Sequence, residues 1–500
     1  MGKIIETKID NFSGGISNDL RVKDGSKFAL TKHFDAFTYP NKLVPHRSTE
    51  ADETKDYKIE NFVYARLTSG GNTVYRLYGL GKVSGQAYAQ IYVYDIDTAF
   101  TGGWGALADA KSKSAVGNRS NKIFFYYKDY IYVSSNSVIK RFHTTGVDDY
   151  NDNYKAVDLG NCQPVHHQSD DCAYFFTANA VHRLNDTTFD GGGTTAVLQL
   201  PTNLVINSAC QYGDYLAIGC TSLGDSDKYS VIFLWDRDSS LTTLSERIDL
   251  GRGALMHLAN LNGRLMAVIN YFLDSTNVSA GKAKLLIRQI SGQYAITVNE
   301  LNSDTAVSTP STSKFIKDNK LYFPLKATLN GDTRYGIWAL DSLGRLSLDF
   351  IEEEVGTGNY VNIYSTGNIW WIAHSNDGSV NRTDNSESYT NTSIYESLIF
   401  NGGDSRLTKK LIGVEVMFEP LPANGQVVLK YRKDADLDGS WTTIFTYTTD
   451  DELSHGAINI EADGSNFPQY KEIQFRIEST GGAVITGLEC KEEIIDKQLF

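Results

Sequence analysis

The chain has 500 residues, a formal net charge of -13 and an aromatic content of 12%. This length exceeds what one hydrophobic core usually supports, so we expect two domains or one large repeat architecture. Acidic and basic residues are mixed without a basic stripe, which argues against tight DNA or RNA binding. No run approaches the roughly 20 apolar residues of a membrane helix, and residues 1–6 lack a signal peptide's apolar stretch, so we expect synthesis in a cytoplasm without membrane insertion.

Residues 1–55 show no strong strand periodicity, although they contain two short motifs at residues 12–16 and 40–47. A segment of this kind cannot bury a core of its own, so it is ordered only where it lies along its own domain or reaches a neighbouring subunit. We therefore predict an extended N-terminal arm over residues 1–55.

Residues 56–385 repeat one pattern, in which a polar turn introduces an apolar or aromatic strand and a partner strand follows. The turns lie at residues 71–74, 128–131, 170–173, 213–216, 262–265, 318–321 and 366–369. Neighbouring turns are about 42 to 57 residues apart, as expected for four-stranded propeller blades. The pattern predicts an all-β fold with a β-propeller of about seven blades. Six blades are possible, with the arm supplying the last strand of a closing unit, and unrelated hairpins in sandwiches are the competing interpretation.

Residues 386–500 change to longer and cleaner alternation. Ile473, Phe475 and Ile477 share one face of a predicted strand, while charged and amide groups share the other. About six such strands predict a C-terminal β-sandwich of jelly-roll-like form over residues 386–500, after a short polar linker at residues 383–388.

Five cysteines do not suggest a disulfide framework, and we expect all of them to be reduced. Cys162 and Cys172, with His166 and His167 between them, match no common zinc spacing. Cys172 also begins a strand-like apolar run, which favours a buried structural residue. We therefore predict no metal and no cofactor at this place.

Three aspartates, Asp434, Asp436 and Asp438, precede Gly439 as in the start of a calcium loop. The bidentate Glu of such loops is missing, because Phe445 occupies the twelfth position, and the flanks are predicted strands instead of helices. A solvated hairpin turn is the better interpretation, and calcium stays a weak alternative.

No nucleotide-binding loop, serine nucleophile elbow or zinc-protease pattern occurs, so we predict that the protein is not an enzyme. Two carboxylates suffice for glycoside hydrolysis, which keeps a propeller glycosidase as an alternative. Trp370, Trp371, Tyr126 and Tyr127 offer rings for stacking on carbohydrate, but packing between blades is the favoured interpretation.

Three short motifs precede the repeat, at residues 9–16, 19–21 and 39–47, and residues 431–442 form a predicted hairpin in the C-terminal part. In these stretches the sequence resembles virion structural proteins of tailed bacteriophages, in particular tail hub, nozzle and tail tubular proteins, in which such an N-terminal arm precedes a β-propeller. The resemblance implies that the arm makes subunit contacts. The implied interaction residues are Phe12, Gly14, Gly15, Pro40, Pro45 and Arg47.

The resemblance further implies a structural subunit of the virion tail, in a homo-oligomeric ring that is hexameric in such proteins, with other tail proteins as partners. An acidic chain fits a ring that lines or caps the DNA exit path and touches the genome only in passing during ejection. The second hypothesis is a receptor- or glycan-binding tail protein that uses exposed aromatics and loop carboxylates at the propeller rim, and the third is the glycosidase.

Overall fold

The computed structural model describes most of the chain, with gaps. The described residues are 3–21, 24–54, 57–69, 72–83, 89–95, 105–106, 123–135, 137–143, 150–190, 195–224, 228–238, 246–273, 281–309, 313–351, 360–374, 379–383, 389, 391–434, 439–448, 455–459 and 469–495.

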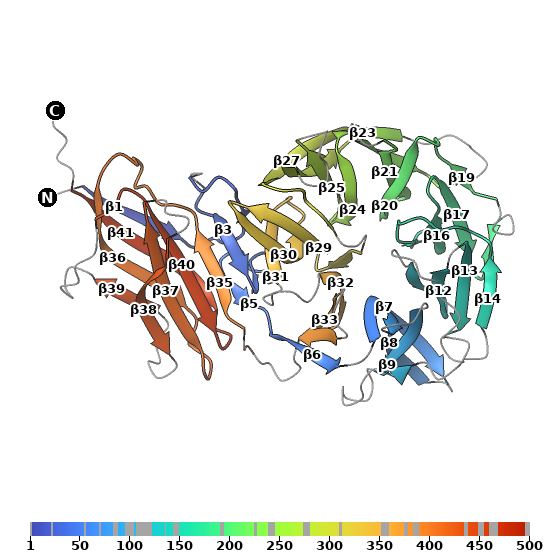
Figure 1. The fold of residues 1–500 in the computed structure, drawn as a ribbon, viewed down its shortest axis with the longest axis horizontal. Helices are drawn as coiled ribbons and strands as arrows, with labels where there is room; N and C mark the ends of the chain where they lie inside the picture. The colour runs from blue at the N-terminus through green and yellow to red at the C-terminus, as the bar shows by residue number, and fades with distance from the viewer. Residues whose placement is uncertain are drawn as a thin grey trace.

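The chain is an all-β protein with a β-propeller, as the repeat predicted. Antiparallel sheets follow one another along residues 57–383 and are arranged in a ring about a common centre (Figure 1). The first three, inner strand first, are β7 (Tyr57–Ser69), β8 (Asn72–Val83), β9 (Ala89–Asp95), β10 (Gly105–Ala106); β11 (Phe124–Tyr127), β12 (Tyr130–Ser135), β13 (Val138–His143), β14 (Tyr150–Lys155); and β15 (Val165–His167), β16 (Cys172–Phe176), β17 (Ala180–Asn185), β18 (Thr188–Phe189), with β19 (Leu198–Gln199) also on β17.

Four further sheets complete the ring in the described part of the chain. They are β20 (Leu204–Tyr212), β21 (Tyr215–Ser222), β22 (Tyr229–Trp235), β23 (Glu246–Arg252); β24 (Ala254–Leu261), β25 (Arg264–Phe272), β26 (Ala283–Ser291), β27 (Tyr294–Ser303); β28 (Phe315–Lys317), β29 (Lys320–Leu329), β30 (Asp332–Leu340), β31 (Leu346–Ile351); and β32 (Tyr360–Thr366), β33 (Ile369–His374), β34 (Ser379–Thr383), β6 (Thr49–Thr54).

The polar turns of the repeat join the first and second strands of these sheets. The turn residues take the left-handed backbone that two-residue hairpins need. Lys128 and Asp129 have φ values of 41° and 62°, and Asn262 and Gly263 have 53° and 78°. Turn chemistry of this kind is local, which explains why the sequence alone located the hairpins.

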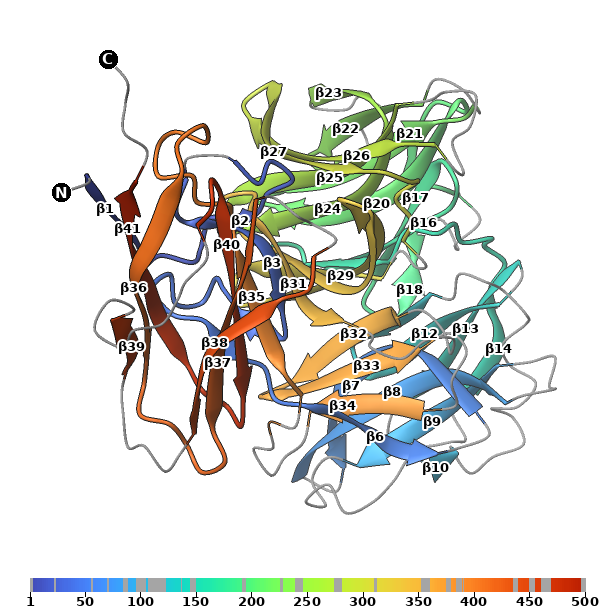
Figure 2. The same cartoon turned by 60° about the vertical axis from the view of Figure 1, so that its left-hand side comes forward.

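The last sheet of the ring is completed from the other end of the chain. Strand β6 pairs antiparallel with β34, with Thr49 opposite Thr383, so a segment before the first blade provides the outer strand of the last one (Figure 2). This pairing closes the ring by hydrogen bonds between the segment that leads into the propeller and the strand that ends it.

The C-terminal domain is a β-sandwich to which the N-terminal segment contributes strands. One sheet has the order β1 (Ile4–Ile9), β41 (Ile485–Ile494), β36 (Lys409–Phe418), β39 (His455–Asn459). The other has the order β2 (Gly15–Ile16), β3 (Lys27–Lys32), β35 (Ser393–Ser397), β40 (Ile473–Thr480), β37 (Gln426–Lys433), β38 (Thr442–Thr448). A two-stranded sheet, β4 (Phe34–Asp35) with β5 (Val44–Pro45), follows β3 along the chain.

This arrangement differs from the predicted division at residues 55 and 385. The N-terminal segment is no separate arm, because β1 pairs with β41, β3 pairs with β35 and β6 pairs with β34. The strand that the segment gives to the closing sheet agrees with the arm strand considered from the sequence, since β6 pairs with β34. The pairings with the sandwich were not predicted, because each partner lies hundreds of residues away and a short strand that pairs over such a distance has no local hairpin signal.

One hydrophobic core runs through both domains. It contains Phe12 and Phe28 from the N-terminal segment, Phe475 from the sandwich and Trp338 from the propeller sheet of β28–β31. The predicted inner face of β40 is confirmed, since Ile473, Phe475 and Ile477 are all buried. In the described part of the chain, no helix has the length and apolar character that crossing a membrane requires.

Candidate functional site

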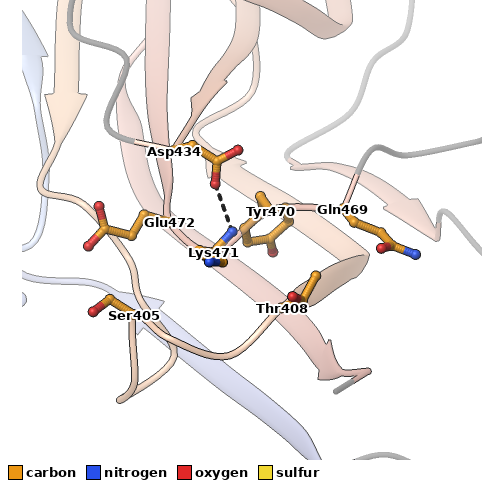
Figure 3. Close-up of a pocket in the computed structure, with 7 residues that line it drawn as sticks. All are labelled: Ser405, Thr408, Asp434, Gln469, Tyr470, Lys471 and Glu472. Carbon is orange, nitrogen blue, oxygen red and sulfur yellow. Dashed lines mark hydrogen bonds between the residues drawn. The ribbon is translucent and has the colours of Figure 1, made fainter. Parts of the chain in front are cut away.

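The described part of the sandwich contains a polar pocket of about 570 Å³ near the end of β37 and the start of β40 (Figure 3). It is lined by Ser405, Thr408, Asp434, Gln469, Tyr470, Lys471 and Glu472. Hydroxyl, amide, ammonium and carboxylate groups therefore surround one space, and the set suits a hydrophilic ligand better than an apolar one.

The carboxylate of Glu472 forms an ion pair with Arg21 of the N-terminal segment. Arg21 Nε and Nη2 donate to its two oxygens, each at 2.9 Å. This is the bidentate geometry in which a guanidinium holds a carboxylate most firmly. Hydrogen bonding and charge from Glu472 raise the pKa of Arg21 above its ordinary value. The ion pair fixes the N-terminal segment at the rim of the pocket.

A network of buried polar groups connects the two segments that form the pocket. Lys409 Nζ donates to the carbonyl oxygens of Asp404, Leu407 and Lys471 at 2.8, 2.9 and 2.7 Å. Tyr470 Oη donates to Glu492 Oε1 at 2.8 Å. Burial raises the pKa of Glu492, although the tyrosine and Lys409 oppose that shift. These bonds hold the loop before β36 against the segment that precedes β40.

The weak calcium candidate is only partly within the described residues. Asp434 lines the pocket, has a φ of 57° and accepts a hydrogen bond from the backbone N of Lys471 at 2.8 Å. Asp436 and Asp438 lie outside the described residues. Within the residues that are described, no three His, Cys, Asp or Glu side chains come together as a metal site.

A second space, of about 350 Å³, lies where the inner strands of the propeller meet, and we call it the axial cavity. Its walls come from β7, β11, β28 and β32 and from the segment before β15. Five of its aromatic residues are partly exposed, and they are Tyr64, Phe125, Tyr126, Phe315 and Tyr364. The amide side chains on its walls are Asn61, Gln163 and Asn362.

Lys314 is the charged residue on the described walls of the axial cavity. Its Nζ donates to Ser208 Oγ, the Ala209 carbonyl and the Leu258 carbonyl at 2.9, 2.9 and 2.5 Å. These acceptors belong to β20 and β24, so one ammonium joins the inner strands of two blades to its own. Burial lowers the pKa of Lys314. The three bonds use all three ammonium protons.

The interaction residues implied by the resemblance lie mostly against the chain itself. Phe12 is buried with its ring 5.2 Å from that of Tyr395, and its N donates to the Pro40 carbonyl at 2.7 Å. Pro45 in β5 is buried and pairs with Phe34 in β4. Pro40 is exposed, and Arg47 is half-buried.

The two glycines of the N-terminal motif lie where other backbone segments come too close to leave room for a side chain. A Cβ on Gly14 would lie 2.5 Å from the backbone C of Ser26, and Gly15 has a φ of +83° beside Leu346. The motif thus closes the segment onto the sandwich and onto β31. Its residue types are explained by packing within one chain.

The remaining residues singled out in the sequence are dispersed. Trp370 and Trp371 are buried, as is Tyr127, and Tyr126 is the stacking candidate that lines the axial cavity. Cys162 and Cys172 are free and buried, and His166 Nε2 lies 2.9 Å from Asp171 Oδ1. Sequence reasoning missed the roles of Arg21 and Glu472 at the sandwich pocket and of Lys314 at the axial cavity, since the partner of a single charged residue cannot be read from a local pattern.

No protein-family model and no curated protein sequence matches this chain. Solved structures that it resembles include the N-terminal domain of Nup159 (12% identity, 67% of this chain, 97% of that chain, TM-score 0.35). They also include the β-propeller domain of Nup133 from Vanderwaltozyma polyspora (9%, 66%, 98%, 0.37) and an ulvan lyase bound to a saccharide (11%, 67%, 95%, 0.41). At these identities and TM-scores the likenesses carry no conclusion about function.

Proposed function

We propose that this chain is a structural subunit of a bacteriophage tail, in which propeller and sandwich act as one rigid body. The observation that carries the proposal is the N-terminal segment, which gives strands to both domains before the propeller begins. Strands shared in this way restrict motion between the two domains. A rigid connection of this kind suits a structural subunit that must keep its shape under mechanical load.

Polar contacts reinforce this junction in addition to the shared core. Lys320 Nζ lies 2.9 Å from Asp35 Oδ2, and Arg345 Nη1 donates to Ser13 Oγ at 2.8 Å. His46 Nε2 lies 3.1 Å from Asp349 Oδ2. Each pair joins the N-terminal segment to the sheet of β28–β31, so relative motion of the two domains would break buried hydrogen bonds.

The ring of subunits that we propose needs a contact surface other than the motif at residues 12–16, because Phe12 and Gly15 are buried within the chain. We assign this role to the outer strand β27 and expect a second copy of this chain against it. Tyr294 and Ile296 of β27 are 75% and 54% exposed, and Val298 is 39% exposed. Apolar residues gathered in this way on a surface are typical of interfaces between proteins.

The full chain should self-associate when its mass is measured by analytical ultracentrifugation, and the protein should be found in purified virions by mass spectrometry. Ile296→Asp should weaken the association at least tenfold, since it places a charge in the contact. Leu223→Asp is the matched control, because Leu223 is 61% exposed but lies in the bend after β21, outside β27. A strictly monomeric chain that is absent from virions would overturn the proposal.

A glycosidase remains the third hypothesis, and the sandwich pocket is where the described residues bring two carboxylates, Asp434 and Glu472, into one space. Both carboxylates already accept hydrogen bonds within the chain, Glu472 from Arg21 and Asp434 from the backbone N of Lys471. A glycosidase needs one carboxyl group that is free to donate a proton to the leaving group, and no uncommitted carboxylate lines the described part of this pocket. The scaffold is therefore the function that the geometry supports best.

A further inference from the structure

The axial cavity has walls that suit a ligand with both apolar faces and hydroxyl groups. Partly exposed rings stand on several blades, with the Phe315 ring centroid 4.7 Å from that of Tyr364. Its volume of about 350 Å³ lies within the range of small-molecule sites. Aromatic rings there can pack against the C–H face of a pyranose.

Polar groups between the rings supply hydrogen-bonding capacity. Gln163 is half-buried on the cavity wall, and among the described residues no partner is found for its side-chain amide. An amide offers two donors and one acceptor oxygen, which matches a pair of neighbouring sugar hydroxyls. Because Gln163 is half-buried on the wall, its amide keeps donors and an acceptor that a ligand in the cavity can use in place of water.

The charge of the walls decides against phosphate ligands. Lys314 contributes the charge on the described walls, and its three ammonium protons are already donated to Ser208, Ala209 and Leu258. A phosphate would need an uncommitted Arg or Lys, which a nucleotide or sugar phosphate would use as its main contact. A neutral ligand meets no such requirement.

We propose that the axial cavity binds a neutral carbohydrate unit, with Gln163 as a hydrogen-bonding residue and the surrounding rings as its packing surface. The site is separate from the β27 surface and from the sandwich pocket. Binding there is independent of the proposed structural role, because neither the domain junction nor the subunit contact uses these residues.

The test is saturation-transfer-difference NMR and calorimetry on the full chain. The probes are D-glucose, D-galactose, L-rhamnose, N-acetyl-D-glucosamine and their oligosaccharides, with glucose 6-phosphate as the charged comparison. At least one neutral probe should bind, and Gln163→Ala should weaken it about tenfold, the loss expected for one or two hydrogen bonds. Gln469→Ala, which removes the matching amide of the sandwich pocket, should leave the affinity unchanged.

Three results would overturn the proposal. No binding by any neutral probe would remove the ligand class, and tighter binding of glucose 6-phosphate than of glucose would contradict the charge argument. Binding that Gln469→Ala weakens and Gln163→Ala does not would place the ligand in the sandwich. Ultracentrifugation of the same variants keeps this outcome distinct from failure of the structural role.

Discussion

Lys320 and Asp35 form a buried ion pair 285 residues apart in sequence, with Lys320 Nζ 3.0 and 2.9 Å from the two carboxylate oxygens of Asp35. The lysine begins β29 of the propeller and the aspartate ends β4 of the N-terminal segment. Lys320 Nζ also donates to Thr38 Oγ1 at 2.8 Å. The pair thus joins the N-terminal segment, just after its sandwich strand β3, to strand β29 of the propeller.

Replacing Lys320 with methionine should lower the free energy of unfolding by about 3–5 kcal/mol, because it leaves a buried carboxylate without its cation. Urea denaturation at pH 7 measures this. Lys284→Met is the control, since that lysine makes a surface pair with Glu300 and should cost less than about 1 kcal/mol. Equal losses in the two variants would contradict the importance of the junction.

Asp35 should make the fold sensitive to acid. Burial alone would raise the pKa of this carboxyl, but the charges of Lys320 and His46 and hydrogen bonds from Thr38 and Lys320 outweigh it and hold the pKa below its ordinary value. The stability that Asp35 contributes is therefore fully present above the pKa of Asp in the unfolded chain, about 3.9, and is lost as pH falls below that value. Asp35→Asn should flatten the decline in unfolding free energy between pH 4 and pH 3, and an unchanged slope would refute this.

His257 should contribute to pH dependence in a different window. Burial first, and then Lys314, lower its pKa to about 3, and its ring lies 4.9 Å from that of Phe323. The unfolded histidine takes up a proton near pH 6.5, so stability is complete above that pH and falls by about 1.4 kcal/mol per unit toward pH 3. His257→Leu should remove one proton from the slope between pH 6 and pH 4. Burial also lowers the pKa of His33 to about 3. His33 should therefore still contribute one proton to the pH slope of the His257→Leu variant.

Lys314→Met should destabilise the propeller by about 2–4 kcal/mol, since it leaves the carbonyls of Ala209 and Leu258 without their donor. Thermal unfolding followed by circular dichroism measures the loss. Lys314→Arg is an informative companion, because a guanidinium keeps the charge but not the compact geometry. Stability equal to the wild type in Lys314→Met would mean that the ammonium does not join the blades.

Gly14→Ala should weaken the sandwich, since the new Cβ would lie 2.5 Å from the backbone C of Ser26 and 2.6 Å from the backbone N of Lys27. Backbone atoms cannot yield as a flexible side chain does, so we expect a loss of at least about 2 kcal/mol. Gly25→Ala is the matched control, with nothing within 4 Å of its added Cβ and an ordinary backbone. Limited proteolysis of the N-terminal segment should increase in the first variant alone.

Local chemistry in the sequence determined the hairpins. Asp, Asn and Gly adopt the left-handed backbone more readily than other residues, so turn pairs such as Asp318–Asn319 and Asn262–Gly263 indicate a hairpin without knowledge of the rest of the fold. The alternation of Ile473, Phe475 and Ile477 likewise followed from the two-residue period of a strand, and burial of all three confirms it.

Tertiary structure alone decided where the N-terminal segment lies and which polar groups meet. Ile9 pairs with Leu488 and Lys32 with Ile394, and Arg21 reaches Glu472 across 451 residues. Such contacts depend on how whole sheets pack, because a strand whose partner is distant carries only a weak pattern and a single charged residue carries none. For the same reason the sandwich pocket and the axial cavity, each built from segments scattered along the chain, exist only once the sheets have come together.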